Sequence, residues 1–146
     1  MNDPLQVGCP HCDAVNRLPA ARLAEQPACG RCHRPLFIGA PIELDAGNFD
    51  RHVGRCDLPV VVDFWAPWCG TCRRMAPAFA QAASALEPAF RFARVDTESQ
   101  PQLAGRFAIR SIPTLIVFRN GREIERRSGA LDLSSLKGWL QPMAPA

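Results

Sequence analysis

Four of the seven cysteines in this 146-residue chain have the spacing of metal ligands. They form two Cys-x-x-Cys pairs with sixteen residues between them: Cys9, Cys12, Cys29 and Cys32. One tight turn can present both thiolates of a pair to a single ion, and two such turns complete the tetrahedral sulfur shell of structural zinc. The sequence therefore predicts one structural zinc ion on these residues, with two disulfides or free thiols as the alternatives. His11 and His33 are expected to be surplus, exposed neighbours.

A third Cys-x-x-Cys pair, Cys69 and Cys72, follows an apolar β-branched run and opens a helical segment. A cysteine at a helix N-terminus faces unpaired backbone N–H groups, which favour its thiolate. Cys72 is one turn further into the helix, within reach of Cys69 and more buried. This arrangement is typical of reversible disulfide exchange, in which Cys69 attacks a substrate disulfide and Cys72 resolves the mixed disulfide.

The elements that must position this pair alternate between strands and helices. Apolar runs predict strands over 58–65, 90–96, 114–119 and 123–128, and helices over 49–55, 70–86, 99–107 and 131–140. Asn120-Gly121 is a hairpin turn, Asn48 and Asp132 are expected helix caps, and Pro77 is expected to kink its helix. This order predicts an α/β fold, with a central mixed sheet and helices on both faces.

The N-terminal segment differs from the rest in composition. Residues 1–40 have few consecutive apolar positions and are too short to fold without a staple, which the four cysteines supply. We therefore expect a zinc ribbon over 1–40, a linker over 41–46 and the α/β domain over 47–146.

Charge and hydropathy exclude several classes of partner. The net charge of +3 is too small to favour nucleic acid or an anionic membrane. Residues 1–46 hold four arginines against five acidic residues, and zinc bound to four thiolates adds a further charge of about −2. No apolar run approaches the roughly 18–20 residues that span a bilayer. The first ten residues lack the regions of a secretory signal, so we expect the cytosol, where thiols stay reduced.

The motifs around Cys69 resemble those of the thioredoxin family over about residues 47–141. They are, in order, Asp63, WAPWCGTC at 65–72, Pro77, Ser111-Ile112-Pro113-Thr114, the Asn120-Gly121 turn and Gly129. With the four-cysteine segment, the whole chain is similar to the zinc-ribbon-containing bacterial thioredoxin 2 type. The resemblance implies a thioredoxin fold preceded by a small zinc ribbon, and a cytosolic protein disulfide reductase.

Further roles follow from that resemblance. Asp63, an acid in an apolar strand, is a proton carrier for Cys72, since burial raises the pKa of a carboxyl group. Arg94 stands where the family has a lysine, and it keeps the charge without being able to lose a proton. Pro113 matches the family's cis-proline and leaves the Ile112 backbone free to pair with a substrate strand. The expected docking surface comprises Trp68, Gly70, Thr71, Ile112, Pro113 and Gly129, whereas Phe64 and Trp65 are expected in the core.

Thr71 departs from the family, which has proline there, and the family pattern implies a less reducing couple without it. A disulfide oxidant or isomerase therefore stays open, as does a redox sensor or holdase that loses zinc on oxidation. Cys56 is either an incidental half-buried thiol or a regulatory, dimer-forming one. The expected partners are an NADPH-dependent thioredoxin reductase and disulfide-containing client proteins. The chain is expected to be a monomer with no organic cofactor.

Overall fold

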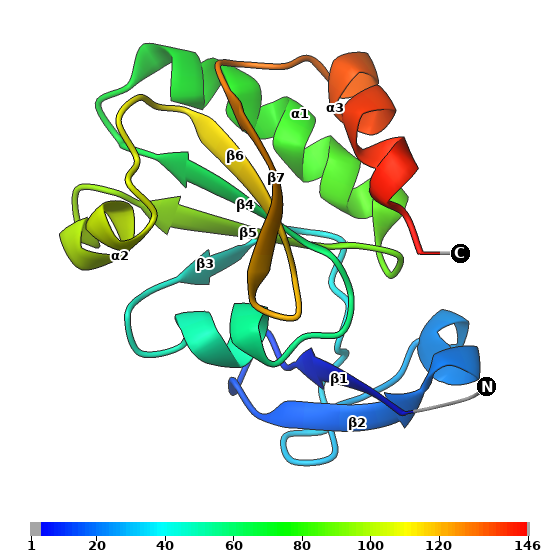
Figure 1. The fold of residues 1–146 in the computed structure, drawn as a ribbon. Helices are drawn as coiled ribbons and strands as arrows, with labels where there is room; N and C mark the ends of the chain where they lie inside the picture. Colours follow the sequence, from blue (N-terminus) through cyan, green and yellow to red (C-terminus); the bar gives the residue numbers. More distant parts are fainter. Residues whose placement is uncertain (1–3, 146) are drawn as a thin grey trace.

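The computed structural model describes residues 4–145, and a five-stranded mixed sheet forms its centre (Figure 1). In chain order the strands are β3 (Ile42–Leu44), β4 (Val60–Trp65), β5 (Arg91–Asp96), β6 (Thr114–Arg119) and β7 (Arg122–Ser128). Their order across the sheet is β3-β5-β4-β6-β7, with β3, β5 and β4 parallel and β6 and β7 antiparallel to their neighbours.

Helices cover both faces of this sheet. They are α1 (Gly70–Leu86) and α3 (Leu133–Leu140) on one face, and α2 (Pro101–Arg106) with the π-helical turn η2 (Asp50–Gly54) on the other. A short 3-10 turn, η3 (Gln141–Met143), follows α3. The predicted α/β fold is confirmed. Within residues 4–145, no helix has the length and apolar character needed to cross a membrane.

Side-chain alternation along β4 divides the core into two layers. Val60, Val62 and Phe64 join the cluster on the η2 face, whereas Val61 joins the cluster beneath α1 and α3. Asp63 shares the alternation of Val61, so its carboxylate lies on the α1 face. That helix turns one apolar stripe toward the sheet: Cys72, Met75, Phe79, Ala82 and Ala83. The helix that begins at the redox pair therefore covers the buried acid.

Two expectations about the chain before β4 are wrong. Part of the predicted linker over 41–46 is strand β3, because Ile42 and Leu44 are buried against the sheet edge while Glu43 faces outward. The helix expected over 49–55 is only the turn η2, and the Asn48 side chain accepts from the Asp45 N–H at 2.8 Å instead of capping it. The predicted cap of α3 is confirmed, since Asp132 accepts from the backbone N–H of Ser135 at 2.8 Å.

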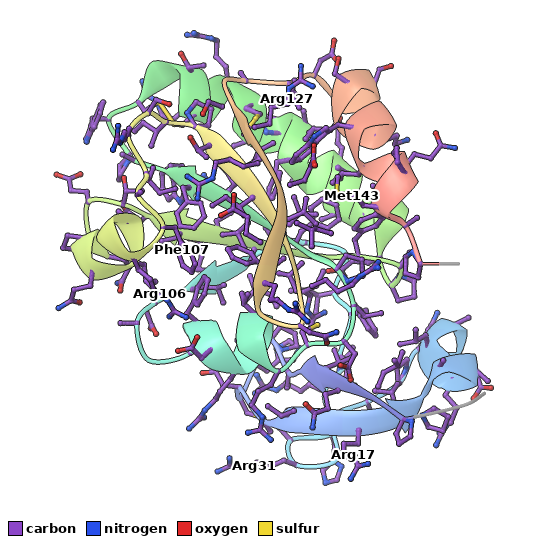
Figure 2. The ribbon with its side chains drawn as sticks, viewed as in Figure 1. Arg17, Arg31, Arg106, Phe107, Arg127 and Met143 are labelled. Atoms are coloured by element: carbon purple, nitrogen blue, oxygen red, sulfur yellow. A yellow bond between two sulfur atoms is a disulfide. The ribbon has the colours of Figure 1, made fainter. Side chains whose placement is uncertain are left out.

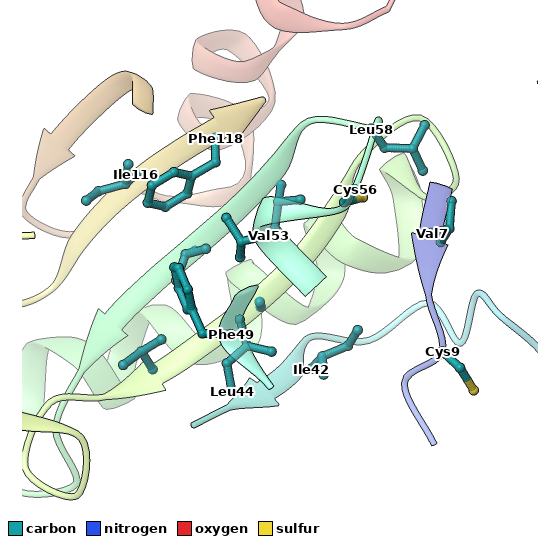
Figure 3. Packing of buried hydrophobic residues seen from close by; sticks show 14 of the residues in the cluster. Val7, Cys9, Ile42, Leu44, Phe49, Val53, Cys56, Leu58, Ile116 and Phe118 are labelled. Carbon is teal, nitrogen blue, oxygen red and sulfur yellow. The ribbon is translucent and has the colours of Figure 1, made fainter. Parts of the chain in front are cut away.

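Residues 4–40, here called the ribbon, pack against the edge of the remainder, here called the body (residues 41–145). The ribbon contains an antiparallel hairpin of β1 (Pro4–Gly8) and β2 (Val15–Pro19), followed by the 3-10 turn η1 (Ala20–Glu25). Val7 lies in the same buried cluster as Phe49 and Val53 of the body (Figure 3). Leu18 and Leu36 belong to it too. The ribbon and the body therefore share one hydrophobic core.

A buried arginine ties the ribbon to the sheet. Arg91 of β5 is 1% exposed, and its guanidinium donates to the carbonyl oxygens of Gly8 and, at 2.7 Å, of Leu36. One carboxylate oxygen of Glu87 lies 3.8 Å from this guanidinium, and the other accepts from the Gly39 N–H at 3.0 Å. One carbonyl belongs to the first strand of the ribbon and the other to its last part. The single Arg91 guanidinium therefore binds both the beginning and the end of the ribbon to β5.

A histidine makes a second polar contact between the two parts. His52 of η2 is buried, and its Nε2 lies 2.7 Å from a carboxylate oxygen of Asp13, the residue after Cys12. Burial lowers the pKa of His52, which favours the neutral ring, and Nε2 is the donor because a carboxylate oxygen can only accept. A Cβ on Gly8 would lie only 2.6 Å from the other ring nitrogen, so the close packing of the ring requires glycine there.

We expect Arg91→Met to lower the free energy of unfolding by about 3–5 kcal/mol, because it leaves Glu87 buried without its cation and two carbonyls without a donor. Urea unfolding of the zinc-loaded chain measures this loss. Arg122→Met, at an exposed arginine of β7, is the matched control and should stay within about 0.5 kcal/mol of the parent. Equal effects of the two substitutions would show that the contacts of Arg91 with the ribbon and Glu87 contribute nothing to stability.

Candidate functional site

The redox pair lies in the turn between β4 and α1, at the end of β4 away from the ribbon (Figure 1). Cys69 is the N-cap of α1, and its sulfur accepts from the Cys72 backbone N–H at 3.1 Å. The two cysteines form a disulfide with a Cα–Cα distance of 5.3 Å. Cys69 is 8% exposed and Cys72 is fully buried, so only the first presents its sulfur to a substrate. The helix N-terminus favours a thiolate at this sulfur once the disulfide is reduced.

Asp63 is a fully buried acid on β4. Neither carboxylate oxygen has a hydrogen-bond partner among the described residues, and the nearest cation is the Arg94 Nε, 3.7 Å from Oδ2. Burial raises the pKa of this carboxyl to about 7, although the charge of Arg94 opposes the shift. A carboxyl group with such a pKa can hold or release a proton near neutral pH, as a proton carrier must.

Arg94 connects this acid to the sheet edge. It lies directly opposite Asp63 in the parallel register of β4 and β5, which agrees with the position that the family resemblance implies. Its guanidinium is 3.4 Å from a carboxylate oxygen of Glu43 and 3.9 Å from the ring centroid of Trp65. Trp65 is only partly buried and covers the arginine, whereas Phe64 lies in the core as expected. Glu43 was not expected at this site, because its segment was predicted to be a linker.

The residues expected to dock a substrate lie on the same turn or on segments that approach it. Trp68 is 68% exposed. Ile112 packs against the redox cysteines Cys69 and Cys72, and the peptide bond that joins it to Pro113 is cis. The Gly129 N–H donates to the Pro113 carbonyl at 2.9 Å, and Gly129 has a positive φ with open space where a Cβ would point. The exposed indole of Trp68 and the space beside Gly129 are thus both open to a substrate.

Thr71 uses its hydroxyl within the redox turn. Its Oγ1 accepts from the Arg74 guanidinium at 3.2 Å.

Cys56 is the cysteine that belongs neither to the redox pair nor to the four-cysteine cluster. It is 1% exposed in the core that the ribbon and the body share, not half-buried as expected. Burial raises the pKa of Cys56 to about 11, so this sulfur is a protonated core group near neutral pH.

The four N-terminal cysteines converge on one point. Their ligand atoms lie within 4.8 Å of one another, with 3.6 Å between the sulfurs of Cys9 and Cys32 and 3.7 Å between those of Cys12 and Cys29. Tetrahedral zinc with bonds of about 2.3 Å places its sulfurs about 3.8 Å apart. The cluster therefore fits zinc, and its closed shell leaves no position for a substrate.

The two metal-binding turns repeat the same hydrogen bonds. In each, the N–H two residues after the first cysteine donates to its sulfur at 3.3 Å, from His11 to Cys9 and from Arg31 to Cys29. In each, the residue after the second cysteine, Asp13 or His33, has a positive φ and donates its N–H to the carbonyl of the first cysteine. Neither histidine joins the four-sulfur group found among the described residues.

A mixed sheet with a Cys-x-x-Cys pair at the start of its first long helix defines a thiol–disulfide oxidoreductase. Comparison with known proteins agrees: the family model described as thioredoxin matches residues 40–142, and that described as thioredoxin 2, N-terminal, matches residues 8–34. The chain belongs to the thioredoxin family, and it carries the zinc ribbon of the thioredoxin 2 type.

Several relatives are similar over most of their length. Thioredoxin C-3 of Corynebacterium nephridii is 47% identical over 132 residues, which cover 90% of each chain. Thioredoxin 1 of a Nostoc species is 38% identical over 104 residues, covering 71% of this chain and 97% of its own. The thioredoxin of Porphyra purpurea is 40% identical over 98 residues, covering 67% and 92%. The first of these alignments is long enough to include part of the ribbon.

The titration of Asp63 makes a prediction about stability. Its pKa is raised from about 3.8 to about 7 on folding, so between these values the folded chain binds more protons than the unfolded chain. Stability therefore falls as the pH rises through this window, by at most about 1.4 kcal/mol per pH unit. In Asp63→Asn this loss is absent, and the variant is more stable than the parent at about pH 8.

Denaturant unfolding of the oxidised proteins across this pH range measures the effect. The exposed Glu98→Gln is the matched control and should follow the parent curve. Curves for Asp63→Asn and the parent that run parallel would contradict the raised pKa.

Proposed function

We propose that the chain is a cytosolic protein disulfide reductase that works through the Cys69-Gly70-Thr71-Cys72 turn. The observation that carries the proposal is the unequal burial of the two sulfurs at the helix N-terminus, with a buried acid that lacks a hydrogen bond beneath the helix. The first sulfur can meet a substrate, and the second can react only with the first. The cytosol suits a chain whose metal cluster needs four reduced thiols.

In the first step the Cys69 thiolate attacks one sulfur of a client disulfide. A new sulfur–sulfur bond joins Cys69 to the client, the client's own disulfide breaks, and its second sulfur leaves as a thiolate that takes a proton from solvent. The proposed docking surface holds the client meanwhile: Trp68, Gly70, Thr71, Ile112, Pro113 and Gly129. The backbone of Ile112 offers hydrogen bonds to an extended client segment.

In the second step Asp63 takes the proton of the Cys72 thiol. The Cys72 thiolate attacks the Cys69 sulfur, the bond between Cys69 and the client breaks, and the client leaves with its second thiolate, which is then protonated. Two electrons pass from the cysteine pair to the client, and the pair ends as a disulfide. Because Arg94 cannot give up a proton, its part is to hold charge beside Asp63.

The oxidised pair must then receive two electrons from a reductant. We assign this to an NADPH-dependent thioredoxin reductase, as in the family the chain belongs to, with disulfide-containing proteins as clients and a monomeric chain. We further propose one zinc ion per chain, held by Cys9, Cys12, Cys29 and Cys32 in a structural role, with no organic cofactor. Elemental analysis of the purified chain gives the zinc count.

Trapping experiments test the assignment of the sulfurs. Cys72→Ser should accumulate a mixed disulfide with a model client through Cys69, because the resolving thiol is gone. Cys69→Ser should form no such adduct. Its NADPH-coupled turnover with thioredoxin reductase should fall at least about a thousandfold. Mass spectrometry identifies the adduct and the joined cysteines.

Cys56→Ser serves as the control because this thiol is buried away from the redox turn, and it should keep the parent activity. An adduct at any other cysteine, or turnover that survives Cys69→Ser, would refute the assignment.

A further inference from the structure

An arginine is fixed over the redox turn without a charge partner. The Arg74 guanidinium donates to the Thr71 hydroxyl at 3.2 Å, and its other terminal nitrogen lies 3.5 Å from where a Cβ on Gly70 would be. The hydrogen bond to Thr71 places the cation beside both residues that separate the redox cysteines. Arg74 is itself exposed, so the outer side of its guanidinium faces solvent where a client must approach.

No carboxylate neutralises this cation within the described part of the chain. The arginines that form ion pairs there are Arg22, Arg91, Arg94, Arg106 and Arg126. A guanidinium carries five N–H donors in a planar fork that matches a carboxylate, and Thr71 engages only one nitrogen. The remaining donors are therefore available to a ligand from solution.

Positions close in sequence to the proposed docking residues add further positive charge. Three further exposed arginines outside those ion pairs flank the proposed docking residues: Arg73 beside Cys72, Arg110 two positions before Ile112, and Arg127 two positions before Gly129. Figure 2 shows Arg127 at the end of β7 farthest from the ribbon. The carboxylates of Asp96 and Asp132 accept hydrogen bonds from the backbone N–H groups of Glu98 and Ser135.

We propose that Arg74, oriented by Thr71, is a specificity-determining residue that binds a carboxylate of the client next to its disulfide. The reductase therefore favours client disulfides flanked by acidic residues. This inference rests on the proposed disulfide reductase activity and on docking at this turn. It also gives Thr71 a role that a proline could not fill, because proline has no hydroxyl to orient the guanidinium.

The test uses three peptide disulfides that differ only in the residues beside the cysteines, which are glutamate, glutamine or lysine. The readout is the ratio of kcat/KM for the acidic peptide to that for the neutral one, so changes in Cys69 reactivity cancel. We expect the parent to prefer the acidic peptide over the neutral one and to react most slowly with the basic one. Because an exposed ion pair contributes little, Arg74→Gln should lower the acidic-to-neutral ratio by about three- to fivefold.

Further variants separate the cation from its orienting hydroxyl. Arg74→Lys should lower the acidic-to-neutral ratio less than Arg74→Gln does. Thr71→Ser should leave this ratio unchanged, and Thr71→Val should lower it. Salt of about 0.5 M should reduce the parent's ratio, because the interaction is exposed. Arg122→Gln is the control. Arg122 is an exposed arginine beside the Asn120-Gly121 hairpin turn, at the end of β7 opposite Arg127, and its substitution should leave the ratio unchanged.

The outcomes are distinct. A ratio that Arg74→Gln does not change, or a parent without preference among the peptides, overturns the role of Arg74 while leaving the reductase activity intact. A parent that reduces none of the three peptides refutes the proposed function itself.

Discussion

The guanidinium of Arg91 is the contact on which the arrangement of the whole chain depends. It is buried between two carbonyls from opposite ends of the ribbon and the carboxylate of Glu87. A buried cation without these partners is very costly, so it commits the ribbon to one position against β5. The apolar contacts of Val7 and Leu36 then extend the core of the body into a segment too small to fold alone.

Docking of the ribbon has a consequence for the redox site. The chain leaves the ribbon and immediately forms β3, whose Glu43 reaches the Arg94 guanidinium at 3.4 Å, and Arg94 in turn lies 3.7 Å from Asp63. The redox turn is five residue steps along β4 from the level of Arg91, which is about 16 Å at the usual strand rise. Strand β3 and the charged side chains of Glu43, Arg94 and Asp63 therefore connect the ribbon to the redox site.

The sequence was sufficient for the features that depend on local patterns. The spacing of the cysteines predicted the sulfur cluster, the apolar run at 58–65 predicted β4, which spans 60–65, and the helix over 70–86 begins and ends as expected. Strand β3 was missed because three residues with a central glutamate give too little alternation to distinguish a strand from a linker. The contacts of Arg91 could not be predicted at all, since they join residues 55 and 83 positions apart and depend on the ribbon's final placement.

The reduction potential of the Cys69–Cys72 pair decides in which direction electrons flow between this chain and its clients. Equilibration against glutathione buffers, followed by tryptophan fluorescence, measures it, since Trp65 and Trp68 lie beside the pair. For a thioredoxin-like reductant that uses Thr71 for client selection, we expect a value of about −270 mV. A value of about −200 mV or above would place the chain with glutaredoxins and disulfide isomerases and would contradict the assignment as a reductase.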